Sequence, residues 1–567
     1  MTEIEKPLIV QSHRELLLDS TSEHYQACRD AMQSFSELVR CPGDYHTYQL
    51  TPLSVWNACS AGATSSSIVN TLNEYARYAI PPSVTNVVNE WSERYGRIHL
   101  VREGERLLLR THDNLMMREI LFVPQVSEAV WSQVDARTVE VNPQFRGTLK
   151  LTLVHAGYPV IDEAGYTEGA PLEIDLRTTT ARGKTFKLRE YQELAAARFW
   201  AEGKLTGGCG VLSLPCGSGK TIIGLRVLQL ARTRTLIIAP GVASARQWQA
   251  EILDKTTLPP EYLGEYSGDI KQIRPVTIAT YHALTAAYRA VDGDKSVINT
   301  PAILTGEPWG LVIYDEVHML PAPMFRLSAE LQSCRRLGLT GTLVREDGKE
   351  LDVFSLIGPG RMDAAWKQME AEGWIASAEC TEIRVPMPQT QSELYASANK
   401  RNRFNVAACN PAKVPVAKYL IDRHSQRSCL VMGQDLDQLA DLSHAIGAPL
   451  IDGRTPNKVR DKYYNEFRNG KHRVLVLSRV GNSAIDLPEA SVAIQVSGMF
   501  GSRQEEAQRL GRILRPRPGD NQAFFYSLVS EDTADVEFAA KRQLFLIEQG
   551  YRYTVKHWHE FMEQQPI

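Results

Sequence analysis

A glycine-rich turn between an apolar run and an amphipathic segment constrains the fold of this chain more than any other feature. The apolar letters GVLSLP lead into Gly217-Ser218-Gly219-Lys220-Thr221, and the helical pattern IIGLRVLQLAR follows. This order of strand, turn and helix suits a triphosphate, because glycines let backbone N–H groups approach phosphates and the start of a helix adds positive potential. Lys220 would neutralise β/γ charge and Thr221 would hold Mg²⁺.

The turn therefore predicts a nucleotide site with Mg²⁺ as cofactor. Leu214 stands where such loops usually have their first glycine, so a glycine-rich turn with an incidental lysine is the alternative. The residues expected to contact the nucleotide are those of the turn and its approach: Pro215, Cys216, Gly217, Ser218, Gly219, Lys220 and Thr221.

Two adjacent carboxylates end the apolar run in WGLVIYDEVHML, about 95 residues after the turn. Asp315 can hold Mg²⁺ through water, and Glu316 can orient and deprotonate the water that attacks the γ-phosphate. The alternatives are a solvated strand end for the two carboxylates and a satisfied polar contact for His318. The position after a strand, in a region that already has a phosphate turn, favours catalysis.

Two further segments fit the same chemistry. QRLGRILR places Gln508, Arg512 and Arg515 at spacings of four and three residues, which predicts one face of one helix and arginines that reach the γ-phosphate when two lobes close. FKLREYQ places Arg189 and Gln192 ahead of the phosphate turn, where a glutamine can pair with both edge groups of adenine and favour ATP over GTP. A solvated basic helix and an ordinary helix start are the respective alternatives.

The pattern of the chain predicts several domains. The 567 residues exceed what one hydrophobic core supports, and short apolar runs alternate with amphipathic helices from about residue 187 onward, which predicts parallel sheets. Before them, LSVWNACSAG, SSSIVNTLNEYAR, a helix introduced by Pro81 and Pro82, and RIHLVREGERLLLRT predict helices followed by a β-hairpin. We predict an α/β fold with two parallel-sheet lobes in tandem and an N-terminal α+β, winged-helix-like region, which binds either DNA or another protein surface.

Composition and sequence patterns exclude several other classes of protein. No apolar run approaches the roughly 20 residues that span a bilayer, and the N-terminus lacks the order of a secretory signal, so we expect a cytoplasmic protein without a membrane partner. The nine cysteines form no C-x-x-C pair at zinc spacing. With a net charge of -3, any contact with nucleic acid must use a local basic strip.

The motifs together resemble those of superfamily 2 helicases, and more specifically the XPB family. The residues that carry the resemblance are LREYQ, PCGSGKT, the DEVH box in DEVHMLPAPMFR, LGLTGTLVREDGK, SRVGNSAIDLPEA, GSRQEEAQRLGRILR, and AFFYSLVSEDT followed by KRQLFLIEQGYRY. The likeness is strong over about residues 185 to 555 and looser over residues 7 to 112, where the chain is similar to shorter bacterial and archaeal-type members.

The resemblance implies two RecA-like lobes with ATP in the cleft, 3′ to 5′ movement on DNA and a role in nucleotide excision repair. It also implies DNA contacts for the R-E-D motif, Arg345, Glu346 and Asp347, and for a thumb-like insertion around Lys400, Arg401, Arg403 and Phe404. A basic cluster beside an aromatic ring would contact phosphates and stack on a base. A solvated helix turn is the alternative for this cluster.

The predicted division is residues 1–112 for the winged-helix-like domain, 113–184 for a small segment of damage-sensing type, 185–385 for lobe 1, 386–410 for the thumb and 411–567 for lobe 2. We expect an ATP-dependent DNA helicase or translocase that acts on forked or duplex DNA as a monomer, with a structure-specific nuclease as a partner. An RNA helicase, or a nucleotide-switched scaffold for that nuclease, are the alternative functions.

Overall fold

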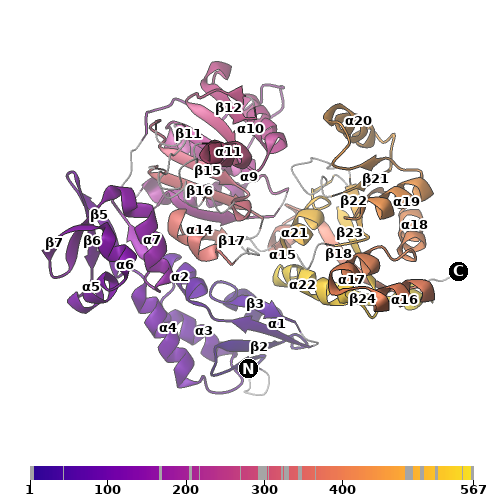
Figure 1. The fold of residues 1–567 in the computed structure, drawn as a ribbon, viewed down its shortest axis with the longest axis horizontal. Helices are drawn as coiled ribbons and strands as arrows, with labels where there is room; N and C mark the ends of the chain where they lie inside the picture. The colour runs from indigo at the N-terminus through magenta and orange to yellow at the C-terminus, as the bar shows by residue number, and fades with distance from the viewer. Residues whose placement is uncertain are drawn as a thin grey trace. The chain divides into compact units, whose positions relative to one another are not determined.

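The computed structural model describes residues 6–41, 44–164, 169–203, 207–215, 217–268, 270–290, 303, 306–320, 324, 331, 333–341, 348–363, 366–478, 490–498, 503–517, 521–551 and 553–563. The chain divides into two compact units (Figure 1). The first holds Met1–Ser213 and Gly219–Asp363, and the second holds Leu214–Ser218 and Ala364–Ile567.

The N-terminal part of the first unit contains two sheets. The four-stranded sheet is antiparallel, in the order β1 (Leu8–Val10), β2 (Glu15–Asp19), β4 (Tyr45–Gln49) and β3 (Glu37–Arg40). The five-stranded sheet has the order β7 (Val130–Asp135), β8 (Thr138–Val141), β6 (Arg106–Thr111), β5 (Ile98–Glu103) and β9 (Val160–Asp162). The accompanying helices are α1 (Tyr25–Met32), α2 (Pro52–Ser60), α3 (Ser65–Tyr75), α4 (Pro82–Arg94), α5 (Asn114–Leu121), α6 (Pro124–Ala129) and α7 (Arg146–His155).

The predicted helices and hairpin of this region are confirmed. Thr51 and Thr64 form capping boxes at the starts of α2 and α3, and Pro82 is the first residue of α4. The hairpin of β5 and β6 pairs through β6 with β8, however, so it belongs to a sheet that continues past residue 112. The winged-helix assignment and the boundary at residue 112 stay predictions.

The first predicted parallel sheet is confirmed in the same unit. Its strands have the order β13 (Ile270–Lys271), β12 (Leu263–Ser267), β14 (Val276–Thr280), β11 (Thr235–Ala239), β15 (Leu311–Asp315), β16 (Arg335–Thr340), β10 (Cys209–Ser213) and β17 (Gly360–Asp363), and all neighbours are parallel except β12 and β13. The associated helices are α8 (Glu190–Trp200), α9 (Lys220–Ala231), α10 (Val242–Lys255), α11 (Tyr281–Ala290) and α14 (Glu350–Leu356). Strands β11, β14 and β15 are buried along their whole length, which explains their continuous apolar sequences.

Helices α9 and α10 meet at a glycine. A Cβ atom added to Gly224 of α9 would lie too close to the ring of Trp248 in α10 for either to stay in place. The buried indole therefore fills the space that a side chain at position 224 would need.

The second unit contains a seven-stranded sheet in which every pair is parallel. Its order is β20 (Leu450–Ile451), β21 (Val474–Leu477), β19 (Ser428–Met432), β22 (Ala490–Gln495), β23 (Gln522–Ser530), β18 (Ser377–Val385) and β24 (Tyr553–His557). The helices are α15 (Trp366–Ala371), α16 (Gln389–Ser397), α17 (Lys400–Ala408), α18 (Lys413–Arg423), α19 (Leu436–Ile446), α20 (Asn457–Arg468), α21 (Arg503–Gly511), α22 (Ala534–Glu548) and α23 (Trp558–Glu563).

Strand β18 lies in a different sheet from the one the sequence suggested. We placed residues 377–385 in lobe 1, but β18 pairs along its full length with β23 of the second sheet. The apolar pattern identifies a buried strand without identifying its partner, which is set by long-range packing. Among the described residues, the helices all fall short of the length and apolar character needed to cross a membrane.

Candidate active site

The register of three parallel strands assembles the site. In the pairing of β10 with β16, Ser213 lies opposite Thr340, and in that of β15 with β16, Asp315 lies opposite Leu339. The carboxyl ends of parallel strands meet at one edge of a sheet, where such folds bind ligands. The carboxylate pair and the end of β16 therefore lie beside the strand that leads into the phosphate turn.

The turn adopts a conformation that its glycines permit. Gly217 and Gly219 have φ angles of +85° and +81°, in the left-handed region. A Cβ atom at Gly219 would stand 2.7 Å from Nε2 of Gln192, so the end of that side chain would have to shift to admit it. Helix α9 begins at Lys220, and the first N–H groups of a helix have no partner within it, which suits a phosphate.

Lys220 and Glu316 form the ion pair at the centre of the site. Lys220 Nζ lies 3.4 Å from Glu316 Oε1, with the two side chains 10% and 20% exposed. Glu316 has a φ angle of +49°, a strained conformation for a residue with a side chain and one that occurs at functional sites. The structure thus brings the turn lysine and Glu316 together, and their catalytic roles stay predictions.

Asp315 is buried and held by α10. Its Oδ2 atom accepts hydrogen bonds from the Ser244 hydroxyl at 2.7 Å and from the Trp248 indole N–H at 3.0 Å. Burial raises the pKa of Asp315, and the neighbouring charge of Glu316 raises it further. Ser244 and Trp248 were not predicted, because their segment ASARQWQ carries no phosphate-binding or metal-binding pattern.

His318 joins the carboxylate pair to the LTGT motif. Its Nδ1 atom and the Thr340 hydroxyl share a hydrogen bond of 2.7 Å, and the same nitrogen lies 3.4 Å from Glu316 Oε2. The side chain is 2% exposed, so it serves as a buried contact between two motifs.

The donor set fits a magnesium ion shared with a nucleotide. Among the described residues, no three His, Cys, Asp or Glu side chains gather as a metal site. Mg²⁺ usually takes one or two protein oxygens and completes its shell with phosphates and water, and the hydroxyl of Thr221, the second residue of α9, and the carboxylate of Asp315 offer those oxygens. No set of metal-binding side chains beyond these is needed.

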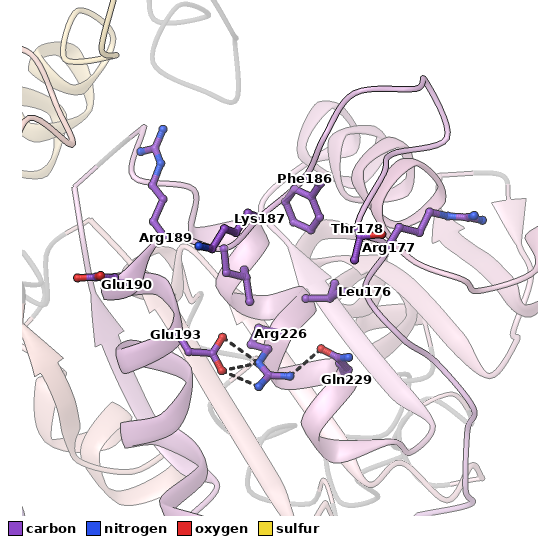
Figure 2. Close-up of a pocket in the computed structure, with 11 residues that line it drawn as sticks. Leu176, Arg177, Thr178, Phe186, Lys187, Arg189, Glu190, Glu193, Arg226 and Gln229 are labelled. Carbon is purple, nitrogen blue, oxygen red and sulfur yellow. Dashed lines mark hydrogen bonds and ion pairs between the residues drawn. The ribbon is translucent and has the colours of Figure 1, made fainter.

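The two residues expected at adenine share a partner, because the side chains of Arg189 and Gln192 each donate to the Tyr191 hydroxyl at 3.4 Å. Gln192 is buried in α8 beside Gly219, and its Oε1 atom accepts the Arg189 backbone N–H at 3.0 Å. Arg189 instead lines a cavity of about 460 Å³ beside α8 and α9. Figure 2 shows Arg226 on one side of this cavity, where it donates hydrogen bonds to both Glu193 and Gln229.

The prediction for the second unit needs a correction. Gln508 lies in α21, but that helix ends at Gly511, so Arg512 and Arg515 follow the helix instead of sharing a face of it. The backbone N–H groups of Arg512 and Ile513 bond back three residues, as in a tight final turn. Pro516 keeps Arg515 out of any longer helix, because a proline disfavours helical conformation in the residue before it.

The residues predicted to contact DNA are only partly described. Arg345, Glu346 and Asp347 lie outside the described residues, as do the side chains of Lys400 and Arg401. Cys216, which was predicted to contact the nucleotide, also lies outside them. Phe404 is 5% exposed and packs edge-to-face on Phe538 at 5.2 Å, so the prediction that its ring stacks on a base is wrong. The apolar face of α17 is turned to α22. Arg403 is exposed and donates to the backbone oxygens of Ala396 and Ala398 at the end of α16.

Known protein families match most of the chain. The model described as ERCC3/RAD25/XPB C-terminal helicase matches residues 369–566, a helicase conserved C-terminal domain matches residues 8–135, and the res subunit of type III restriction enzymes matches residues 185–345. The chain is 46% identical over 552 residues to "DNA 3'-5' helicase XPB" of Mycobacterium tuberculosis, covering 97% of each chain. It is also 46% identical to the protein of that name from Kineococcus radiotolerans, covering 97% of this chain and 96% of that one.

A eukaryotic relative covers the same length. The chain is 32% identical over 573 residues to "General transcription and DNA repair factor IIH helicase/translocase subunit XPB" of Enterocytozoon bieneusi, covering 96% of this chain and 92% of that one. The two parallel sheets are thus RecA-like helicase lobes, and the chain belongs to the XPB family of DNA helicases.

Proposed function

We propose that this chain is an ATP-dependent DNA helicase or translocase in which the edge of the first parallel sheet carries out ATP hydrolysis. The observation that carries the proposal is the pairing register that brings the phosphate turn, Asp315 and Glu316 to one edge, with Lys220 3.4 Å from Glu316. Relatives named as DNA 3′-5′ helicases over nearly the whole chain support DNA as the nucleic acid.

The Lys220–Glu316 pair suggests how the chain's own residues would begin the reaction. Without nucleotide, the ammonium group neutralises the carboxylate in a partly buried setting. When phosphates occupy the turn, Lys220 turns its charge to them, and Glu316 is freed to orient and deprotonate the attacking water. A magnesium ion held by Thr221 and Asp315 would supply charge stabilisation at the phosphates.

Residues of the second unit complete the proposal. Arg512 and Arg515, with Gln508, would stabilise the charge that develops on the γ-phosphate as the lobes close, which would couple hydrolysis to movement. We propose 3′ to 5′ movement on the names of the relatives, and a role in nucleotide excision repair with a structure-specific nuclease as partner on the resemblance of the motifs. A monomer acting in the cytoplasm is the simplest form of this proposal.

ATP turnover with different nucleic acids tests the proposal. We expect forked or duplex DNA to stimulate turnover more than RNA does, and Lys220→Ala and Glu316→Gln to reduce it by a factor of about 100 or more. Matched controls are Lys255→Ala and Glu251→Gln, which break an ion pair of 2.6 Å on α10 of the same unit. Preferential stimulation by RNA would identify an RNA helicase, and nucleotide binding without multiple turnover would identify a nucleotide-switched scaffold.

A further inference from the structure

Helix α10 places two neutral donors on a single oxygen of Asp315. The Ser244 hydroxyl and the Trp248 indole N–H both reach Oδ2, at 2.7 and 3.0 Å, and the Asp315 backbone oxygen accepts the Tyr281 hydroxyl at 2.9 Å. Ser244 and Trp248 are 5% and 1% exposed. These bonds are shielded from water, so each one restrains the carboxylate more than an exposed bond would.

The two donors act together because of where they lie on α10. They are four residues apart, so they share one face of the helix, and the Trp248 ring is packed against Gly224 of α9. The χ2 rotation of an aspartate is broad, so a carboxylate without such partners has no fixed orientation. Two donors on Oδ2 fix the plane of the group and leave Oδ1 without a part in either bond.

Comparison with other buried aspartates indicates that this arrangement does more than satisfy a core carboxylate. Asp162 pairs directly with Arg146 and Lys150, and Asp535 pairs with Lys413 at 2.9 Å. Both of these buried carboxylates are thus neutralised by cations. The hydrogen bonds to the side chain of Asp315 come from the neutral groups of Ser244 and Trp248, which orient the carboxylate without supplying a counter-charge.

We propose that Ser244 and Trp248 are positioning residues that bind Oδ2 of Asp315 and thereby reserve Oδ1 for the divalent cation that accompanies the nucleotide. The inference rests on the proposed function, because it takes Asp315 as an oxygen ligand of that cation. Partners that orient a metal ligand commonly change metal affinity by 10- to 100-fold when they are removed.

Binding of Mn²⁺ tests this inference without reliance on turnover. The full chain with ADP is titrated with Mn²⁺, and the free ion is measured by electron paramagnetic resonance. We expect Ser244→Ala and Trp248→Phe each to raise the Mn²⁺ dissociation constant by about tenfold or more. Ser244→Thr keeps the hydroxyl and should restore most of the affinity, and binding of ADP in the presence of EDTA should change less than twofold.

Two substitutions in the same unit provide matched controls. Trp309→Phe removes an indole N–H that donates to the Ile303 backbone oxygen at 2.6 Å, and Ser333→Ala removes a hydroxyl that donates to the Arg335 backbone oxygen at 2.9 Å. Both side chains are as buried as those of α10. We expect them to lower thermal stability without changing Mn²⁺ affinity.

The outcomes separate this inference from the proposed function. If Asp315→Asn weakens Mn²⁺ binding while Ser244→Ala and Trp248→Phe leave it unchanged, the positioning role is wrong and the metal role of Asp315 stands. If Asp315→Asn itself leaves Mn²⁺ affinity unchanged, the metal role fails and the inference fails with it. A loss of affinity that the two controls reproduce would also overturn the inference, since general loosening of the core would explain it.

Discussion

The two parallel sheets carry charged clusters at their carboxyl edges, and the clusters differ in how deeply their ion pairs are buried. In the first unit, an open cluster of Lys220, Asp315 and Glu316 holds one ion pair at 3.4 Å, part of which reaches solvent. In the second unit, a closed cluster of Lys413, Asp535 and Arg542 lies beyond β22 and β23. Lys413 Nζ contacts Asp535 at 2.9 Å and the Val496 backbone oxygen at 3.1 Å, and Arg542 lies 3.6 Å from Asp535.

The pKa values of the two aspartates move in opposite directions. Burial raises the pKa of Asp315, and Glu316 adds to the effect. Burial would also raise the pKa of Asp535, but the charges of Lys413 and Arg542 more than offset it, so this pKa lies below its ordinary value. The carboxyl edges of the two sheets therefore hold aspartates of opposite behaviour: the pKa of Asp315 is raised, and buried cations lower that of Asp535.

Removal of the buried lysine should produce the largest effect. Lys413→Met leaves Asp535 without its nearest cation in a fully buried position, and we expect a loss of about 3–5 kcal/mol in the free energy of unfolding of the second unit. Lys220→Met is the matched substitution in the open cluster and should lower the unfolding free energy by less, because the Glu316 side chain is 20% exposed whereas that of Asp535 is 2% exposed. Denaturant unfolding checks both, and equal losses would erase the distinction between the clusters.

Acid should lower the unfolding free energy of the second unit through the closed cluster. The decrease should be smaller than that caused by removal of Lys413. The folded pKa of Asp535 is lower than its unfolded value, so its contribution is fully present above the unfolded pKa of about 3.9 and is lost as pH falls below it. We expect the unfolding free energy of the second unit to decrease from about pH 5 downward. In Asp535→Asn, the same titration by circular dichroism should have a shallower slope, and an unchanged slope would assign the acid sensitivity to other carboxylates.

The smallest effect should concern recognition of the nucleotide base beside the open cluster. Gln192→Ala should reduce the preference for ATP over GTP in kcat/KM by roughly tenfold, because one or two hydrogen bonds to the base are lost. Gln229→Ala is the control, since Gln229 lines the cavity in Figure 2 and does not contact Gly219. A larger change from Gln229→Ala would place base recognition in that cavity.

The sequence predicted those parts of the site that are local in the chain. Strand, turn and helix are contiguous around Lys220, and the strand that ends at Asp315 is a continuous apolar run. Helices α2, α3 and α4 carry their own capping and proline signals. The antiparallel sheet of β1 to β4 had no such signal in residues 7–44 and was not foreseen.

The remaining features depend on contacts between distant segments. The pairing of β18 with β23 joins residues more than a hundred positions apart, and the bonds from Ser244 and Trp248 to Asp315 span about 70. Phe404 shows the converse, since a basic and aromatic cluster suggested exposure, while the ring packs on Phe538 of α22. Pro516 is a local signal that Arg515 does not belong to a helix, and it conflicts with the helical spacing of Gln508, Arg512 and Arg515.

The close contact of α9 and α10 at Gly224 connects the position of Lys220 in the open cluster to the orientation of Asp315. A methyl group at this position would force the indole of Trp248 to yield, and the indole N–H would be drawn from the Asp315 oxygen that it holds. Gly224, a residue with no side chain, thus sets how closely α9, which begins at Lys220, can approach α10, which orients Asp315. Chemistry at the sheet edge depends in part on a position that contributes no functional group.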